Sequence, residues 1–181
     1  MKLDISEQID APSGTTITIR AGNTVTIQGP KGDVTRQFFD PHIHISTNSA
    51  SPNKLQLNAL RGTRREKKRL HTYCAHLKNM IAGVHQPHEY RLKICSGHFP
   101  MNIHSTSAQF SVKNFLGEKI PRTLAIPAGV TINVEGDIII VTSPNLELAG
   151  QTASCLEHLT RITNKDPRVF QDGIYITTKP E

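Results

Sequence analysis

The amino-acid sequence is internally duplicated, and this constrains the fold more than any other feature. Residues 24–39 align with residues 109–124 at a constant offset, with apolar residues matching apolar residues and a glycine matching a glycine. Further along, residues 55–60 correspond to residues 137–142 as a strand that leads into a helix. Because each half has the same order of elements, several short strands and then one helix, the duplication predicts two homologous domains in tandem.

The strands of both halves are predicted from the alternation of β-branched apolar and polar residues. Gly22 and Asn23 separate two of them as a hairpin turn. Since no helix lies between successive strands, we expect antiparallel pairing and an α+β fold, with one helix packed on one face of an antiparallel β-sheet in each domain. The expected domains are residues 1–84 and 85–181. The expected strands are residues 15–19, 24–28, 34–38, 110–113, 131–134 and 138–141, and residues 164–176 are expected to form a loop, a turn and a short terminal strand.

The first helix is predicted from its N-terminal signal and its apolar spacing. Thr63 followed three residues later by Glu66 has the pattern of a capping box. Leu70, Cys74 and Leu77 follow the spacing of a buried helix face. Gly83 is expected to stop this helix.

The second helix has the charge pattern of an ordinary supporting helix. We expect Ser143 as its N-cap, Pro144 at its first position, Glu147 in its first turn and Arg161 in its last turn. An acid near the start of a helix and a base near its end both agree with the helix dipole.

Basic residues are concentrated in one part of the chain. The formal net charge is +6, and residues 61–93 carry nine Lys or Arg against two Asp or Glu, so this segment accounts for the whole excess. Cations in the first turn of a helix oppose its dipole, which favours an anionic partner outside the chain. A solvated helix face or a nuclear import signal is the alternative. The residues expected to bind a polyanion are Arg61, Arg64, Arg65, Lys67, Lys68 and Arg69.

The sequence gives no positive indication of catalysis. Its nine histidines do not form the dense Cys/His cluster of a structural zinc site, so no metal site is expected. It lacks a Walker A loop, a dinucleotide-binding glycine motif and a G-x-S-x-G nucleophile motif. We therefore expect no enzymatic activity, no cofactor and no small-molecule substrate. The less favoured alternative is a small metalloenzyme with His42, His44, His85 and His88 as ligands.

The cysteine count and the hydropathy pattern indicate the compartment. The three cysteines, Cys74, Cys95 and Cys155, are an odd number and are expected to be free thiols in a reducing environment. No apolar run approaches the roughly 20 residues that span a bilayer, and the first ten residues lack the apolar segment of a signal peptide. We expect a soluble intracellular protein with no membrane partner.

Six short motifs occur along the chain in the order typical of one protein family. They are residues 29–32 (GPKG), 64–66 (RRE), 72–84 (TYCAHLKNMIAGV), 98–103 (HFPMNI), 114–119 (NFLGEK) and 164–176 (NKDPRVFQDGIYI). Together they resemble the universal large-subunit ribosomal protein six family, numbered nine in eukaryotic nomenclature, and specifically its archaeal and eukaryotic branch. The resemblance extends over nearly the whole chain, and it implies two homologous α+β domains with a structural, RNA-bound role in translation.

The resemblance also implies a set of partners and a location. Large-subunit rRNA would be bound near the sarcin-ricin loop and the stalk base, close to neighbouring large-subunit ribosomal proteins and to translational GTPases. The location would be cytoplasmic, in the large ribosomal subunit, with a nucleolar stage during assembly if the organism is eukaryotic. A free-standing RNA-binding regulator is the alternative. In the C-terminal half, the implied rRNA contacts are Arg161, Lys165, Arg168 and Tyr175, with Asn114 and Lys119 as weaker candidates.

Overall fold

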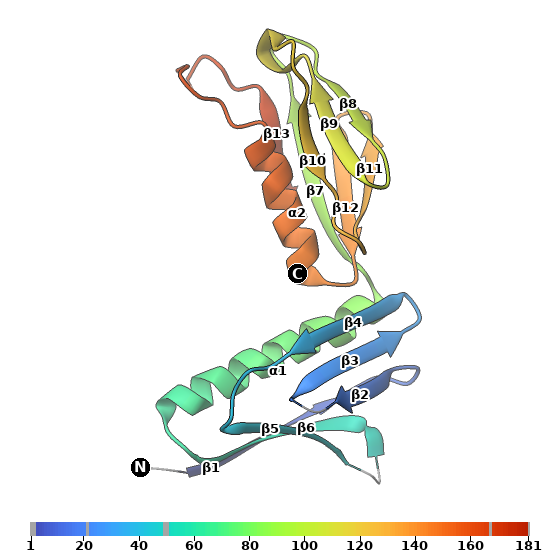
Figure 1. Ribbon diagram of the computed structural model, residues 1–181, viewed down its shortest axis with the longest axis vertical. Helices are drawn as coiled ribbons and strands as arrows, with labels where there is room; N and C mark the ends of the chain where they lie inside the picture. Colours follow the sequence, from blue (N-terminus) through green and yellow to red (C-terminus); the bar gives the residue numbers. More distant parts are fainter. Residues whose placement is uncertain (1–2, 21, 49–50, 167, 181) are drawn as a thin grey trace. The chain divides into compact units, whose positions relative to one another are not determined.

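The computed structural model describes residues 3–20, 22–48, 51–166 and 168–180. The chain divides into two compact units, Met1–Pro87 and His88–Glu181 (Figure 1). Each unit has its own hydrophobic core. Among the described residues, no helix is both long enough and apolar enough to cross a membrane.

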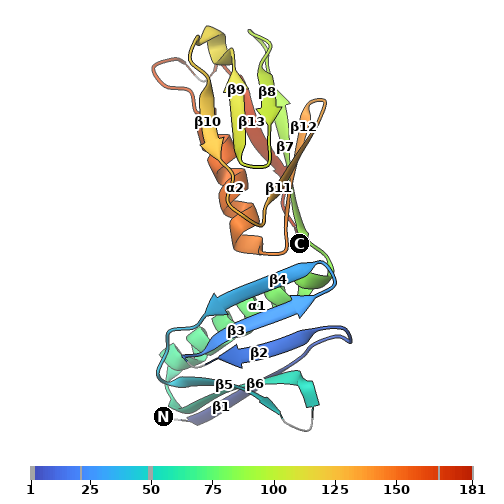
Figure 2. The ribbon, with the colours of Figure 1, turned by 45° about the vertical axis from the view of Figure 1, so that its right-hand side comes forward.

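The first unit contains two antiparallel sheets and one helix. One sheet has the order β1-β6-β5, with β1 at Leu3–Asp10, β5 at Ile43–Asn48 and β6 at Ser51–Gly62. The other has the order β2-β3-β4, with β2 at Thr16–Arg20, β3 at Thr24–Gly29 and β4 at Gly32–Gln37. The helix α1 spans Arg64–His85 and contacts strands of both sheets. Figure 2 shows it behind β3 and β4.

The first core forms between α1 and the two sheets. Leu70 and Leu77 on α1 are fully buried, as their helical spacing predicts. The end of α1 is joined to the turn between β3 and β4, because the Lys31 amide donates to the Val84 carbonyl at 3.0 Å. Gly29 allows this close approach, since a Cβ atom there would lie only 2.8 Å from Val84 Cγ2.

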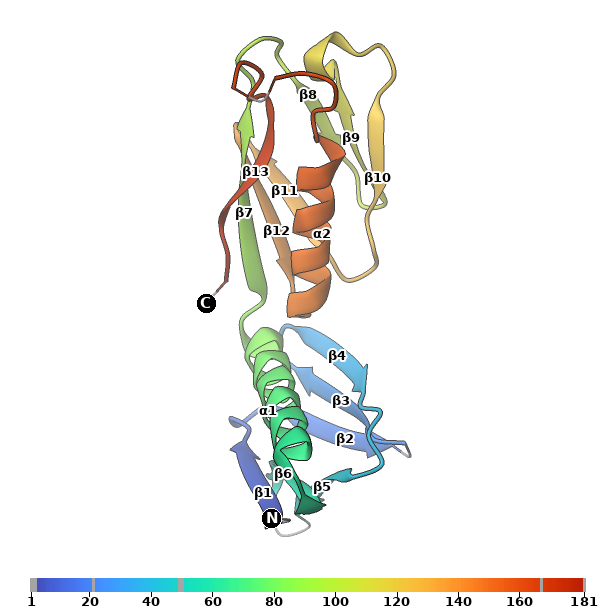
Figure 3. The same cartoon turned by 90° about the vertical axis from the view of Figure 1, so that its left-hand side faces the viewer.

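The second unit repeats this arrangement with one more strand. One sheet has the order β11-β12-β7-β13, with β7 at His88–Cys95, β11 at Thr131–Glu135, β12 at Ile138–Ser143 and β13 at Gly173–Thr178. The other has the order β10-β9-β8, with β8 at Asn102–Ser105, β9 at Gln109–Lys113 and β10 at Arg122–Ala125. A short 3-10 helix, η1, spans Phe115–Gly117. The helix α2 spans Leu146–Leu159 and contacts β7, β12 and β13 on one face of the larger sheet (Figure 3).

The duplication seen in the sequence corresponds to equivalent elements in the two units. β3 pairs with β2 and β4, as β9 pairs with β8 and β10. Val25 and Phe110, which the alignment matches, are both fully buried. β6 leads into α1 as β12 leads into α2. The predicted α+β class with two homologous antiparallel units is confirmed, and each unit contains a second antiparallel sheet in addition.

The first helix ends later than predicted. Gly83 does not stop α1, because it is buried inside the helix and Val84 after it still packs into the core. The helix continues to His85, and Gln86 is its C-cap.

The second helix also differs from the prediction at both ends. Ser143 is the last residue of β12, and its hydroxyl donates to the Gly129 carbonyl at 2.8 Å. Asn145 is the N-cap, since its side chain accepts from the Glu147 amide at 3.0 Å. Arg161 lies beyond the last helical residue rather than in the last turn.

Candidate nucleic-acid interface

The start of α1 is fixed by the predicted capping box. The Thr63 side chain accepts from the Arg65 amide at 3.3 Å, and the Glu66 carboxylate accepts from the Thr63 amide at 2.8 Å. The Thr63 hydroxyl also donates to Glu66. These hydrogen bonds lower the pKa of Glu66 to about 2, so its carboxylate is ionised at neutral pH.

Most of the predicted basic residues at this end of α1 project into solvent. Arg64, Arg65, Lys67 and Lys68 are exposed, and none forms an ion pair within the described part of the chain. Their positive charges lie beside the positive end of the helix dipole. We call these four residues the α1 basic cluster. The side chain of Arg61 lies outside the described residues.

Arg69 differs from the cluster because it has an internal partner. Its Nη1 donates to Oδ2 of Asp40 at 2.9 Å, and the Asp40 side chain is completely buried. The other Asp40 oxygen accepts from the His42 amide at 2.9 Å, which fixes the loop between β4 and β5. Arg69 therefore stabilises the fold, although its side chain is still 42% exposed.

In the second unit, the loop between α2 and β13 is attached to the end of β7 by one buried carboxylate. Asp172 accepts hydrogen bonds from the Gly97 amide at 2.5 Å, from the His98 amide at 2.9 Å and from His98 Nδ1 at 2.6 Å. Burial alone would raise the pKa of Asp172, but these hydrogen bonds outweigh burial and hold its pKa below the usual value. The carboxylate is therefore charged and orders both segments.

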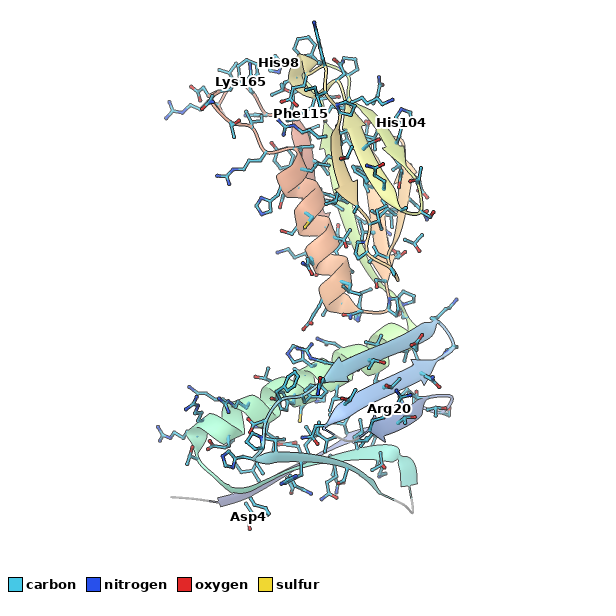
Figure 4. The ribbon with its side chains drawn as sticks, in the orientation of Figure 1. Asp4, Arg20, His98, His104, Phe115 and Lys165 are labelled. Carbon is cyan, nitrogen blue, oxygen red and sulfur yellow. The ribbon has the colours of Figure 1, made fainter. Side chains whose placement is uncertain are left out.

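A stack of side chains covers the same end of the unit. The His98 ring stacks on the Phe170 ring, with centroids 4.7 Å apart. The Lys165 ammonium lies 4.5 Å from the centroid of Phe170, as a cation–π contact. Figure 4 shows His98 and Lys165 at this end. Lys165, one of the predicted RNA contacts, is thus held in a defined position.

The other predicted residues of the C-terminal half are distributed around this end of the unit. Tyr175 is 42% exposed, and its hydroxyl donates to the Gln171 carbonyl at 3.3 Å. Arg168 has an exposed side chain, and its amide donates to the Asp166 side chain at 2.9 Å. Asn114 has a left-handed backbone conformation and donates to the Pro100 carbonyl at 3.1 Å.

Arg122 connects the segments that carry Lys119 and Arg161, which are both exposed. It forms an ion pair with Glu118 at 2.6 Å, which lowers the pKa of that carboxyl, and it lies over the Phe115 ring. Its Nη1 also donates to the Arg161 carbonyl at 3.1 Å. The η1 turn and the end of α2 are therefore held together by one guanidinium group.

Reasoning from the sequence did not assign a role to His98, Phe170, Asp172 or Arg122. His98, Phe170 and Asp172 lie within the motifs that carry the family resemblance, but those motifs do not indicate that His98 contacts the other two residues. A residue pair more than 70 positions apart, such as His98 and Asp172, leaves no periodic signal in a single sequence.

The histidines and cysteines have separate surroundings. Within the parts of the chain that the structure describes, no group of three or more His, Cys, Asp or Glu side chains is placed to hold a metal ion. His85 is hydrogen-bonded to the Thr15 hydroxyl at 2.7 Å, and His88 is buried. All three cysteines are free, and burial raises the pKa of the Cys74 thiol.

Comparison with known proteins gives a consistent result. A family model described as "Ribosomal protein L6" matches residues 11–86 and again residues 99–173. The chain is 39% identical to "Large ribosomal subunit protein uL6" of Methanocella arvoryzae, over 95% of this chain and 96% of that protein. It is 38% identical to the protein of the same name from Methanobrevibacter smithii, over 97% and 96% of the two chains. It is 41% identical to that of Nanoarchaeum equitans, over 87% and 84%. These relatives are archaeal ribosomal proteins, and the two family matches coincide with the two units: the chain belongs to the ribosomal protein L6 family.

Proposed function

We propose that the chain is a structural constituent of the large ribosomal subunit, where it binds large-subunit rRNA near the sarcin-ricin loop and the stalk base. Neighbouring large-subunit proteins and translational GTPases then lie close to it, and its location is the cytoplasmic ribosome. Membership of the ribosomal protein L6 family supports this role, since the relatives compared above are named as proteins of the large subunit.

The observation that carries the proposal is the α1 basic cluster. Four exposed cations lie where the helix dipole is already positive. Within the described residues none of the four forms an ion pair, and the one acid of this turn, Glu66, is hydrogen-bonded to Thr63. Such an arrangement destabilises the isolated helix and is compensated when phosphates bind. Release of counterions from RNA then supplies binding free energy.

The C-terminal half supplies the second part of the proposed interface. Arg161, Lys165, Arg168 and Tyr175 are exposed around the ordered loop between α2 and β13, and Lys119 and Asn114 lie in or beside the η1 turn. Because the grooves of A-form RNA present little base identity to side chains, we expect this surface to recognise mainly the shape and the phosphates of folded RNA. Arg69 and Arg61 complete the proposed set of contacts.

The salt dependence of rRNA binding tests the proposal. For the full chain and a large-subunit rRNA fragment that contains the sarcin-ricin loop, we expect a log–log slope on the order of −5. Replacing Arg64, Arg65, Lys67 and Lys68 together by Gln should make this slope shallower by about 3. A control variant with the same change of charge in the same unit replaces four other basic residues, Arg20, Lys31, Lys54 and Lys78, and should leave the slope near that of the wild type. A wild-type slope near zero contradicts the proposal.

Sucrose-gradient fractionation separates this role from a free-standing RNA-binding regulator. A structural constituent sediments with the large subunit after a wash at moderate salt. A regulator forms a pool that sediments away from ribosomes, and that result would favour the alternative.

A further inference from the structure

The end of the larger sheet in the second unit contains an open hollow of about 600 Å³. It lies where β7 ends and β13 begins, and the loop between α2 and β13 forms one of its sides. The lining residues that matter for its chemistry are Cys95, His98, Val169, Asp172 and Tyr175. This volume accommodates a nucleobase together with part of its ribose.

One wall of the hollow is the His98 ring, and that ring is held rigidly. Asp172 accepts from its Nδ1 and from its backbone amide, and Phe170 stacks against it. The ionised Asp172 carboxylate can only accept a hydrogen bond, so His98 Nδ1 carries the donated proton. In the neutral imidazole, Nε2 is then the acceptor nitrogen. Within the described residues, no hydrogen bond occupies Nε2. An amino or imino N–H of a planar heterocycle is the complementary donor.

A second wall is the Tyr175 ring, which is also fixed. The ring folds back over Gly173, where an added Cβ atom would lie 3.2 Å from the ring carbons and its oxygen. The Tyr175 hydroxyl donates to the Gln171 carbonyl at 3.3 Å. A glycine at position 173 is therefore required for this ring position. Aromatic side chains that are already immobilised lose little entropy when a flat ligand stacks on them.

Cations lie beside both walls. Lys93 is directly opposite Tyr175 in the antiparallel register of β7 and β13, so the two side chains share one face of the sheet. Lys165 lies over Phe170, which stacks on His98. The hollow therefore combines planar aromatic walls and an apolar side chain, Val169, with two positive charges next to the residues that form or support these walls. This combination suits one base of an RNA strand, with its two flanking phosphates toward the cations.

We infer that this hollow binds a single unstacked nucleobase of RNA against the Tyr175 ring, with His98 Nε2 as its hydrogen-bond acceptor and Lys93 and Lys165 near the adjoining phosphates. The inference deepens the proposed function and rests on it. It assigns to the second unit a base-binding contact in addition to general phosphate binding.

The first experiment uses isolated nucleotides as probes of the full chain. In an amide NMR titration with the four nucleoside 5′-monophosphates, we expect the amides of Gly97, His98 and Tyr175 to shift, with affinities in the millimolar range typical of one stacked base. Ribose 5-phosphate, which lacks the base, is the matched control and should leave these amides unshifted. Equal shifts with both probes would show a simple anion site and overturn the inference, as would the absence of shifts with all four nucleotides.

The second experiment measures binding of the rRNA fragment by Tyr175 variants. Tyr175→Ala should weaken binding roughly tenfold without changing the salt slope, because a stacking surface is lost and no cation is removed. Tyr175→Phe restores the ring and should recover most of that loss. If wild-type protein binds the fragment with a steep salt slope but Tyr175→Ala binds equally well, the inference fails and the proposed function stands. If nucleotides bind in the hollow but the wild type does not bind rRNA, the proposed function fails instead.

Discussion

The two helices of this protein occupy equivalent positions in a duplicated fold, but their first turns carry opposite charges. α1 follows β6 and opens with Arg64, Arg65 and Lys67 around a single acid, Glu66, whereas α2 follows β12 and opens with Glu147 alone. The acid of α2 agrees with the helix dipole, and the three cations of α1 oppose it at about 0.3 to 1 kcal/mol each. Since the packing of the two units is alike, folding does not require this difference. The difference supports the proposal that the first unit carries charge for a partner.

The two proposed RNA surfaces also differ in how their side chains are held. In the α1 basic cluster the cations extend into solvent. In the second unit, Lys165 makes a cation–π contact with Phe170, His98 is hydrogen-bonded to Asp172, and Tyr175 is hydrogen-bonded to Gln171. An exposed cluster without internal ion pairs contributes long-range attraction and counterion release, whereas a preorganised surface contributes position and specificity. The expected division is electrostatic capture by the first unit and placement by the second.

The largest effect is expected from removing the carboxylate that orders the second surface. Asp172→Ala removes three hydrogen bonds and leaves two backbone amides without their acceptor. We expect a loss of about 3 kcal/mol in the free energy of unfolding of the second unit. Native-state hydrogen exchange on the full chain reports each unit separately, and amides of the first unit should keep their protection. Asp137→Ala, at an exposed turn of the same unit, is the control and should cost little. Equal protection in the two variants would contradict this role of Asp172.

The pH dependence of stability follows from the same carboxylate. The pKa of Asp172 in the folded protein is lower than its usual value of 3.8, so the ionised form stabilises the second unit above about pH 4. That contribution is lost as the pH falls through the lowered pKa. We expect protection of the Gly97 and His98 amides to decrease on acidification below pH 4, and to decrease less in Asp172→Ala. A variant as acid-sensitive as the wild type would show that other carboxylates cause the loss.

The next largest effect compares two proposed RNA contacts on the same helix, one with an internal ion-pair partner and one without. Arg69→Gln removes the ion-pair partner of a completely buried Asp40, and we expect a loss of about 2 kcal/mol from the first unit. Lys68→Gln removes a neighbouring exposed cation and should leave stability nearly unchanged while it weakens rRNA binding. Urea unfolding and rRNA binding, measured on both variants, should rank them in opposite orders, because the ion pair with Asp40 leaves Arg69 less charge for RNA than Lys68 has. The same rank in both assays would show that the two cations have one role.

The sequence predicts the local and periodic features of the two units, but not the contacts between residues that are distant along the chain. The capping box of Thr63 and Glu66 and the buried positions of α1 are local or periodic, and the structure agrees with them. The predicted end of α1 is wrong, because the packing of Val84, a tertiary contact, outweighs the tendency of Gly83 to end a helix. The attachment of Asp172 to His98 and the burial of Asp40 under Arg69 depend on residues brought together only by folding. The charge of the proposed interface is therefore visible in the sequence, whereas the hydrogen bonds and ring contacts that hold its second part in place are not.

The smallest expected effect exchanges the charges that distinguish the two helices. Arg64→Glu places an acid in the first turn of α1 and should stabilise the first unit by about 0.5 kcal/mol, while rRNA binding weakens through loss of one cation and gain of one anion. Glu147→Lys makes the converse change in α2 and should destabilise the second unit by a similar amount. Hydrogen exchange at low ionic strength resolves both shifts, and added salt should reduce them. If Arg64→Glu destabilised the first unit, the cations that open α1 would be serving the fold, and the α1 basic cluster would lose its main argument for a role in RNA binding.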